Sequence, residues 1–388
     1  MIQFCDGNRV ELLRSGAEYF PALVAACDAA TSEIHLQTYI FSEDGSGQAV
    51  AEALMRAARR NVAVHLLMDG FGSKELSAGF LRQLREAGVR VLKYRPQIAA
   101  WRFRRTQLRR LHHKVAVVDA HIAFVGGINV IDDMDTPGQV PPRFDYAVKV
   151  EGPLLAQICP VVTRLWGLVA WTQLRLHKMP SSTVSIKAED CGTQRAAFVI
   201  RNNVRHRKDI ENAYLESMRR AKSEILIANA YFFPGKNFRR ALIDAAARGV
   251  RVVLLLQGRV EYRLLHYASR ALYRQLLDAG IEIFEYRRSF MHAKVAVIDN
   301  HWATVGSSNI DPLSLLLARE ANIVVEDIEF ARGLRSSLEA AMTTGAEPVR
   351  RMVWRKQRLP TRIVSWLCYE IVRFLTGWSS YGRARDFT

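Results

Sequence analysis

Two copies of one short motif organise this sequence: Leu111-His112-His113-Lys114-Val115-Ala116-Val117-Val118-Asp119 and Met291-His292-Ala293-Lys294-Val295-Ala296-Val297-Ile298-Asp299. Both read His-x-Lys-x4-Asp, with the same kind of apolar run between the Lys and the Asp. Each is followed by a turn of small residues that ends in an asparagine, Asn129 in the first copy and Asn309 in the second. Four polar residues repeated in register are not a chance match, so the chain contains an internal duplication.

The apolar run of each motif predicts a buried β-strand, because its residues are β-branched or small. Side chains two positions apart share one face of a strand. His112 and Lys114 therefore point the same way, while His113 points to the other side. The same geometry holds for His292 and Lys294. A solvated strand end is the alternative interpretation of each His-Lys pair, and the duplication argues against it.

The residue types of the motif suit chemistry at a phosphate. A neutral imidazole can attack phosphorus, and an ammonium and an amide can hold the non-bridging oxygens as charge builds up. Two copies supply two imidazoles, one to attack and one to protonate the leaving oxygen. The candidate catalytic residues are His112, Lys114, Asp119, His292, Lys294 and Asp299, with Asn129 and Asn309 as phosphate ligands. The two aspartates have the wrong parity for the His-Lys face, so we expect them to act behind the strand, orienting or pairing.

Two further carboxylates follow the motifs, Asp145 in the first half and Glu320 in the second. Each begins an apolar, strand-like run. A carboxylate in this position can accept the second ring N–H of a motif histidine and fix its tautomer. From the residues alone, a surface carboxylate is the favoured interpretation.

Composition limits the class of protein and its partners. The chain has 388 residues, enough for two domains with full cores, and 49% of them are hydrophobic, as in an ordinary globular protein. Its formal net charge of +17 implies an anionic partner, either nucleic acid or an acidic membrane surface. Five scattered cysteines without a Cys-x-x-Cys pair argue against a zinc site or a disulfide framework. No signal-like region and no long uncharged apolar run occur, so we expect no membrane-spanning helix.

The duplication extends beyond the motif. Ser32-Glu33-Ile34 matches Ser223-Glu224-Ile225, and the order of strand-like and helix-like stretches repeats around both. Alternating strands and helices predict an α/β fold. We expect two duplicated α/β/α lobes, each with a mixed, largely parallel sheet flanked by helices, that face each other across one shared cleft. Residues 8–31 have helical spacing of their apolar positions, which predicts a helix.

Four regions are predicted. They are a first lobe at residues 1–159, a connecting segment with an apolar, Trp-rich helix at 160–200, a second lobe at 201–345, and a basic amphipathic tail at 346–388. The tail pattern is typical of a helix in a membrane interface. The apolar helix at 160–176 fits either a membrane interface or ordinary core. The loop at 96–111, which only the first half has, carries aromatic and basic residues that suit lipid headgroups, nucleic acid or plain solvation.

The paired His-x-Lys-x4-Asp motif resembles the signature of the phospholipase D superfamily. The segments 229–235 and 301–315 resemble the bacterial cardiolipin synthases, specifically the B-type enzymes without N-terminal transmembrane helices. This resemblance runs through nearly the whole chain. It implies a two-lobed fold with a pseudo-twofold cleft, a phosphohistidine intermediate, no metal and no cofactor. It also implies that Asp145 and Glu320 orient the histidines. One departure is Ala318, where the family often has an asparagine.

The resemblance further implies transfer of a phosphatidyl group between two phosphatidylglycerol molecules, giving cardiolipin and glycerol. By analogy His112 is the nucleophile and His292 the acid/base. The implied partner is an anionic membrane of phosphatidylglycerol and cardiolipin rather than nucleic acid, and the implied location is the cytoplasmic face of the bacterial inner membrane, as a peripheral protein. The alternatives are a phosphodiesterase or endonuclease acting on nucleic acid, and phospholipid hydrolysis; the apolar tail argues against nucleic acid. The sequence does not indicate an oligomeric state.

Overall fold

The structure is a computed structural model that describes residues 2–95, 109–174, 185–186, 188–202, 206–311, 318–355 and 359–381. The first half contains β1 (Cys5–Arg14), α1 (Ser15–Ala29), β2 (Glu33–Thr38), α2 (Gly45–Arg59), β3 (Ala63–Asp69), α3 (Ala78–Glu86), β4 (Arg90–Tyr94), β5 (Arg110–Leu111), β6 (Lys114–Val118), β7 (Ile122–Gly126), β8 (Arg143–Phe144), β9 (Tyr146–Glu151) and α4 (Leu155–Thr172).

The second half repeats this order. It contains β10 (Gln194–Arg201), α5 (Asp209–Arg220), β11 (Glu224–Asn229), α6 (Lys236–Ala247), β12 (Arg251–Gln257), α7 (Arg263–Asp278), β13 (Glu282–Tyr286), β14 (Phe290–Met291), β15 (Lys294–Ile298), β16 (Trp302–Gly306), β17 (Ala318–Glu326) and α9 (Ile328–Gly345). The chain continues with β18 (Ala346–Pro348), α10 (Arg351–Arg355) and α11 (Leu359–Tyr381).

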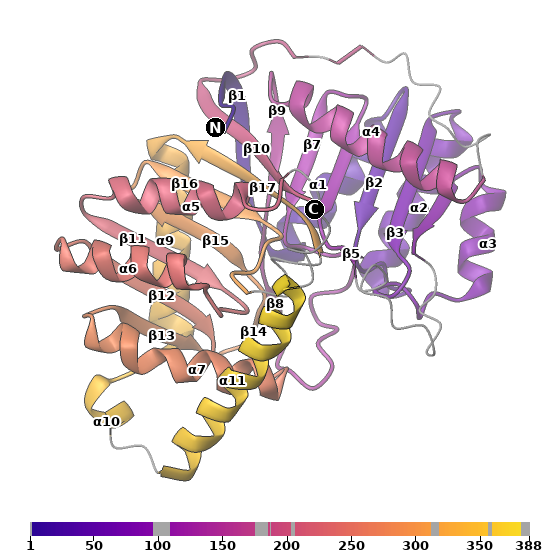
Figure 1. Cartoon of the computed structure of the whole chain (residues 1–388). Helices are drawn as coiled ribbons and strands as arrows, with labels where there is room; N and C mark the ends of the chain where they lie inside the picture. Colours follow the sequence, from indigo (N-terminus) through magenta and orange to yellow (C-terminus); the bar gives the residue numbers. More distant parts are fainter. Residues whose placement is uncertain are drawn as a thin grey trace, which may run out of the picture.

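The two halves share one continuous sheet, because β1 pairs with β10 (Figure 1). Outward from this junction the order is β1-β9-β7-β6-β2-β3-β4 in the first half and β10-β17-β16-β15-β11-β12-β13 in the second. The same succession of strands on both sides confirms the predicted duplication. The predicted mixed α/β fold with flanking helices is also confirmed.

The prediction of a largely parallel sheet was wrong. Among the described strands of each half, parallel pairing joins only β2-β3-β4 and β11-β12-β13. The motif strands β6 and β15 pair antiparallel with both of their neighbours. A tight turn returns the chain directly after each motif, and consecutive strands joined by such a turn must run antiparallel.

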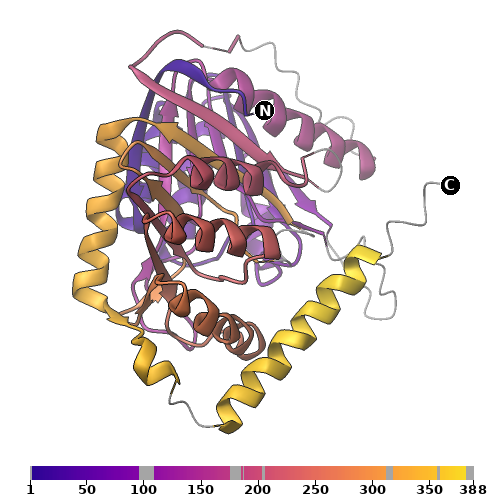
Figure 2. The same ribbon diagram turned by 60° about the vertical axis from the view of Figure 1, so that its left-hand side comes forward.

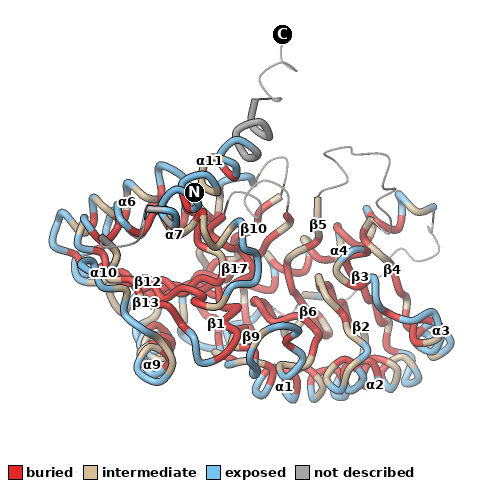
Figure 3. The backbone as a smooth tube through the Cα atoms, turned by 90° about the horizontal axis from the view of Figure 1, so that it is seen from below, coloured by how far each residue is buried: buried red, intermediate tan, exposed pale blue. Residues whose placement is uncertain are grey.

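Helices cover both faces of each half of the sheet. Apolar residues of α1, α2 and α3 pack on one face of β2, β3 and β6, and α5, α6 and α7 do the same in the second half. The opposite faces share a core to which β6, β7, β15, β16, α4 and α9 contribute. Buried backbone therefore runs without interruption from one half to the other (Figure 3). The motif strands are buried on both faces, which explains their unbroken apolar runs.

Three other predictions need correction. Residues 8–31 are not one helix, since β1 occupies Cys5–Arg14 before α1 begins. The helical spacing of the apolar residues was misleading there, because β1 has buried positions on both faces. The segment at 160–200 is not only a connection, because β10 begins at Gln194 and is the first strand of the second repeat. The tail begins with β18, which pairs with β13. Most of the predicted basic loop at 96–111 lies outside the described residues.

The apolar helix of the connecting segment, α4, is largely core. Val162, Trp166 and Val169 are buried, and Trp166 has no exposed surface. Trp171 and Leu174, by contrast, are exposed. The alternative that this helix packs onto the body is therefore confirmed for its inner face.

The last helix, α11, lies against α7 on the outside of the second half, on the side opposite α9 (Figure 2). Val372 is buried in this contact, and the ring of Tyr369 lies 5.5 Å from that of Phe233. The outer face of α11 exposes large apolar side chains: Ile363, Val364, Trp366, Leu367, Ile371 and Phe374. Among the described residues, no helix combines the length and the hydrophobicity that crossing a bilayer requires.

Candidate active site

The two motif histidines enter the site through short strands that cross between the halves. β5 pairs with β17, and the backbone N–H of His112 donates to the carbonyl oxygen of Arg319 at 3.0 Å. β14 pairs with β8, and the N–H of His292 donates to the carbonyl oxygen of Phe144 at 2.8 Å. Each histidine is thus fixed by backbone of the opposite half.

This crossing gives each histidine a carboxylate from the opposite half. His112 Nδ1 lies 3.0 Å from the Glu320 carboxylate, and His292 Nδ1 lies 2.7 Å from Asp145 Oδ2. Both carboxylates are buried. A carboxylate accepts, so it fixes the proton on Nδ1 and leaves the lone pair of Nε2 free to react. The structure therefore places the two predicted orienting residues at the motif rings.

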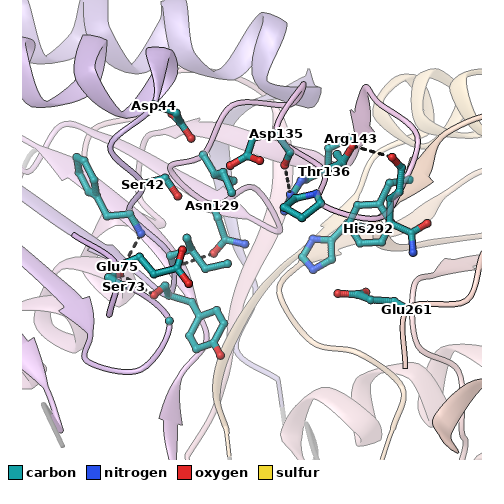
Figure 4. Close-up of a pocket in the computed structure, with 18 of the residues that line it drawn as sticks. Ser42, Asp44, Ser73, Glu75, Asn129, Asp135, Thr136, Arg143, Glu261 and His292 are labelled. Atoms are coloured by element: carbon teal, nitrogen blue, oxygen red, sulfur yellow. Dashed lines mark hydrogen bonds between the residues drawn. The ribbon is translucent and has the colours of Figure 1, made fainter. Parts of the chain in front are cut away.

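The rings of both motif histidines line one pocket of about 750 Å³ between the halves. Asn129, the predicted phosphate ligand of the first half, also lines it. Asn309 is buried and is not part of the lining, and its Oδ1 has no hydrogen-bond partner among the described residues. Figure 4 shows Asn129 on one side of the pocket and His292 on the other. The predicted shared cleft is therefore present.

Both motif lysines are buried beneath the rings. Lys114 Nζ donates to the carbonyl oxygen of His112 at 2.6 Å. Lys294 Nζ donates to the carbonyl oxygen of His292 and lies 3.7 Å from Asp145 Oδ2. The two buried lysines thus lie close to the two buried carboxylates. Charge–charge interactions among these groups are stronger than they would be in water.

Burial sets the protonation of the site. Loss of water lowers the pKa of His112, although Glu320 opposes the shift, and it lowers the pKa of His292 well below the ordinary value. Burial also lowers the pKa of Lys114 to about 7 and that of Lys294 to about 8. Burial alone would raise the pKa of Glu320, but His112, Lys114 and Ser307 lower it to about 2. The resting site therefore holds neutral imidazoles next to an ionised carboxylate.

Asp119 and Asp299 lie away from this chemistry. Asp119 accepts from the backbone N–H groups of Thr31, Ser32 and Glu33 at 2.8–2.9 Å. Asp299 accepts from the backbone N–H groups that open β11 at 2.8–2.9 Å. Each motif lysine is the first residue of a five-residue strand and each aspartate follows the last, so at a rise of about 3.3 Å per residue the two lie at opposite ends of the strand. These carboxylates join the end of the motif strand to the start of its neighbour. Each also accepts from a serine hydroxyl, Ser32 or Ser223, which explains why the serine is repeated.

His113 points away from the pocket, as its position in the strand predicts. Its Nε2 lies 2.8 Å from Oε1 of the buried Gln37. The Nε2 group of Gln37 donates in turn to the carbonyl oxygen of Val162 in α4. His113 thus ties the motif strand to the core.

Sequence reasoning missed several residues of the pocket. The ring of Tyr39 packs on that of His112 at 5.0 Å, and Lys114 Nζ lies 5.6 Å from the Tyr39 centroid. Arg143 lines the pocket and its charge helps to lower the pKa of His292. Glu261 lines the pocket next to His292 (Figure 4). Only Arg143 had a visible signal, because it stands two residues before Asp145.

No cluster of three or more potential metal ligands occurs among the residues that the structure describes. Among the described residues, Arg143 brings a positive charge to the lining of the pocket.

Known proteins share both the sequence and the fold. Residues 23–134 and 214–342 match the family described as "Cardiolipin synthase, PLD-like domain". The chain is 38% identical over 386 residues to Cardiolipin synthase B of Escherichia coli (strain K12), with 96% of this chain and 90% of that protein covered. It is 30% identical to Cardiolipin synthase 1 of Bacillus anthracis, covering 92% of this chain and 71% of that protein.

Among solved structures, phosphatidylserine synthase of Haemophilus influenzae Rd KW20 has the same fold, with a TM-score of 0.70 at 11% identity. That likeness covers 95% of this chain and 94% of the other. Because the family match spans most of the chain and includes both motif regions, the chain belongs to the cardiolipin synthase family, whose members carry a phospholipase D-like domain.

Proposed function

We propose that this protein is a cardiolipin synthase, a phosphatidyltransferase that joins two phosphatidylglycerol molecules to give cardiolipin and glycerol. One observation carries the proposal: two neutral imidazoles, each held at Nδ1 by a carboxylate of the opposite half, line a single pocket. Two such rings on one phosphorus suit a double displacement. The names of the similar proteins support the choice of lipid substrate.

The reaction follows from the positions of the groups. His112 Nε2 attacks the phosphorus of one phosphatidylglycerol, and the P–O bond to glycerol breaks as His292 gives that oxygen a proton. His292 then takes a proton from a hydroxyl of a second phosphatidylglycerol, and the resulting oxygen displaces His112 from phosphorus. Glu320, which is ionised, stabilises the positive charge that His112 acquires on bonding to phosphorus. This charge pairing supports His112 as the nucleophile.

The remaining residues have supporting roles in this proposal. Asn129, which lines the pocket, holds a non-bridging oxygen. Lys114 and Lys294 stabilise the phosphate by their charge from beneath the rings, and the negative phosphate favours the charged form of both lysines. The predicted role of Asn309 as a phosphate ligand requires its side chain to reach the pocket, whose lining does not include it. Asp145 keeps His292 in the correct tautomer. Asp119 and Asp299 position the motif strands without touching the substrate.

The substrate lies in a membrane, and we propose that the protein binds an anionic bilayer from the cytoplasmic face. The net charge of +17 favours such a surface. Exposed apolar side chains gather on α11. Others line the pocket or stand within two residues of its lining in the sequence: Phe71, Met134, Val140, Val260, Tyr262 and Leu264. Exposed apolar groups on a strongly basic protein fit a bilayer interface better than they fit nucleic acid.

The test is a reaction of the purified chain with phosphatidylglycerol vesicles in the presence of EDTA. We expect lipid chromatography to show cardiolipin, and we expect His112→Ala and His292→Ala each to abolish it. Labelled DNA is offered in parallel. Normal cardiolipin formation by both variants, or cleavage of DNA without any lipid product, would contradict the proposal.

A further inference from the structure

The two sides of the pocket differ at one pair of matching positions. Ser73 follows β3 at the same distance at which Glu261 follows β12. Ser73 is buried, and its hydroxyl is fully engaged: it accepts from the N–H of Phe41 at 2.9 Å and donates to the carbonyl oxygen of Tyr39 at 3.1 Å. Glu261 instead presents a carboxyl group to the pocket. At this pair of matching positions, therefore, only the second half has an acidic group, and that group lies on the His292 side of the pocket.

Glu261 is held in place and remains accessible. The hydroxyl of Tyr231 donates to Glu261 Oε2, and Tyr231 also lines the pocket. Removal from water raises the pKa of Glu261, and the charges of Arg143 and Lys294 oppose that rise. The carboxyl group therefore interacts electrostatically with Arg143 and Lys294. Figure 4 shows it on the same side of the pocket as His292.

A carboxylate is an unsuitable neighbour for a phosphodiester, since like charges repel. Its partner on a substrate must be a hydrogen-bond donor. An ionised carboxyl group has about four acceptor positions, and the hydroxyl groups of Tyr231 and Tyr262 occupy two of them. The others can accept hydroxyl groups of the substrate, and such charge-assisted bonds are stronger than neutral ones.

We propose that Glu261, held by Tyr231, binds the hydroxyl group that neighbours the reacting oxygen of a glycerol headgroup, and so selects vicinal diols. This inference rests on the proposed function, in which glycerol leaves beside His292. In the first displacement, the leaving oxygen is bonded to a CH2 group, and the following carbon of the glycerol carries a hydroxyl. In the second, the attacking oxygen of the acceptor phosphatidylglycerol is likewise bonded to a CH2 group whose neighbouring carbon carries a hydroxyl. One carboxylate on the His292 side therefore serves both displacements.

The experiment measures competition between small alcohol acceptors. Phosphatidylglycerol vesicles are the donor, and 1,2-propanediol, 1,3-propanediol, 1-propanol and ethanolamine compete in one reaction with the full chain. Mass spectrometry counts the phosphatidyl products. We expect the wild-type protein to favour 1,2-propanediol over both 1-propanol and 1,3-propanediol. Glu261→Gln exchanges a charged acceptor for a neutral one, which lowers that preference about tenfold while transfer to 1-propanol continues.

Two further variants sharpen the result. Tyr231→Phe removes the anchor and shifts the preference in the same direction by a smaller factor. Glu75→Gln is the matched control, because Glu75 lines the same pocket on the far side from His292 (Figure 4). It leaves the preference for the diol unchanged.

Several outcomes would overturn the inference. The first is a Glu261→Gln variant that keeps the wild-type preference for the diol. The second is a Glu261→Gln variant that loses transfer to every alcohol equally. The third is a Glu261→Gln variant that loses only the use of ethanolamine, which would show that the carboxylate binds an ammonium group. A wild-type protein that forms no phosphatidyl product, cardiolipin included, would overturn the proposed function itself and the inference with it.

Discussion

The proton on Nδ1 decides what each motif histidine can do. When Nδ1–H donates a hydrogen bond to a carboxylate, Nε2 keeps a lone pair that can attack phosphorus or accept a hydroxyl proton. In this protein the carboxylate comes from the other half in both cases, Glu320 for His112 and Asp145 for His292. Neither half can orient its own histidine. A functional ring therefore requires that the two halves be packed correctly on each other.

The pH dependence of kcat/KM follows from these residues. Both imidazoles have pKa values below the ordinary 6.5, so the acid limb is expected below pH 6.5. Lys114 and Lys294 lose their protons near pH 7 and 8 in the free protein, so affinity for the phosphate falls as pH rises through that range. We expect a bell-shaped profile, measured with phosphatidylglycerol vesicles. Rates that stay constant up to pH 10 would show that the lysines titrate normally.

The sequence predicted the residues of this site better than their pairing. Strand parity alone placed His112 and Lys114 on one face and His113 on the other. The partner of each carboxylate could not be predicted, because it depends on the backbone pairing of β5 with β17 and of β14 with β8. Each pairing joins segments far apart in the chain, and two-residue strands have no recognisable pattern. Glu261 matches Ser73 in the first half, which is not acidic, and so it escaped a search for repeated residues.

At the level of elements, the aspartate that ends each motif strand is a fastening point. Asp119 and Asp299 both have positive φ, 51° and 53°, at the turn that leads to the next strand. Their carboxylates accept backbone N–H groups that the neighbouring strand leaves unpaired at its start. Each copy of the motif thus has two roles: its His and Lys side chains face the site, and its Asp joins the motif strand to the neighbouring strand. The same turn makes the central pairings antiparallel, which the helix–strand alternation in the sequence did not reveal.

Asp119→Ala is expected to lower stability and to leave chemistry in the folded fraction intact. It removes the acceptor of several backbone N–H groups, which costs about 2–4 kcal/mol of unfolding free energy. The hydrogen bonds from Ser32, Thr31 and Glu33 hold the pKa of Asp119 below its ordinary value despite partial burial. Its contribution is therefore present above about pH 4 and is lost as pH falls below that value. Urea unfolding measures the change.

Asp28→Ala is the matched control for this variant. Asp28 forms an exposed ion pair with Arg56, at 2.9 Å, and its loss costs at most about 1 kcal/mol. An Asp119→Ala protein that unfolds like wild type but no longer forms cardiolipin would show that Asp119 takes part in catalysis directly.

On the scale of the whole molecule, the protein combines a strongly basic charge with apolar side chains that its own fold leaves uncovered. The inner face of α11 packs on α7, but Trp366 and Phe374 are 58% and 69% exposed. Exposed aromatic residues on a helix with arginines suit the interface of an anionic bilayer. In the proposed membrane binding, electrostatic attraction brings the protein to the surface, and apolar burial holds it there. The first effect weakens with salt and the second does not.

Because this binding has an electrostatic and an apolar part, we predict how it responds to lipid charge, to salt and to mutation. We expect flotation with phosphatidylglycerol vesicles but not with phosphatidylcholine vesicles, and weaker flotation at high salt. Trp366→Ser and Phe374→Ser each remove a side chain whose burial is worth about 1.5–3 kcal/mol, so each lowers affinity for vesicles at least about tenfold. Transfer from a short-chain, soluble phosphatidylglycerol stays at the wild-type rate, because none of the described side chains of α11 lines the pocket. Trp171→Ser, at an exposed position of α4, is the control for removing a surface tryptophan. If α11 only stabilised the fold, its variants would slow reaction with soluble and vesicular lipid equally, whereas a binding surface makes the loss specific to vesicles.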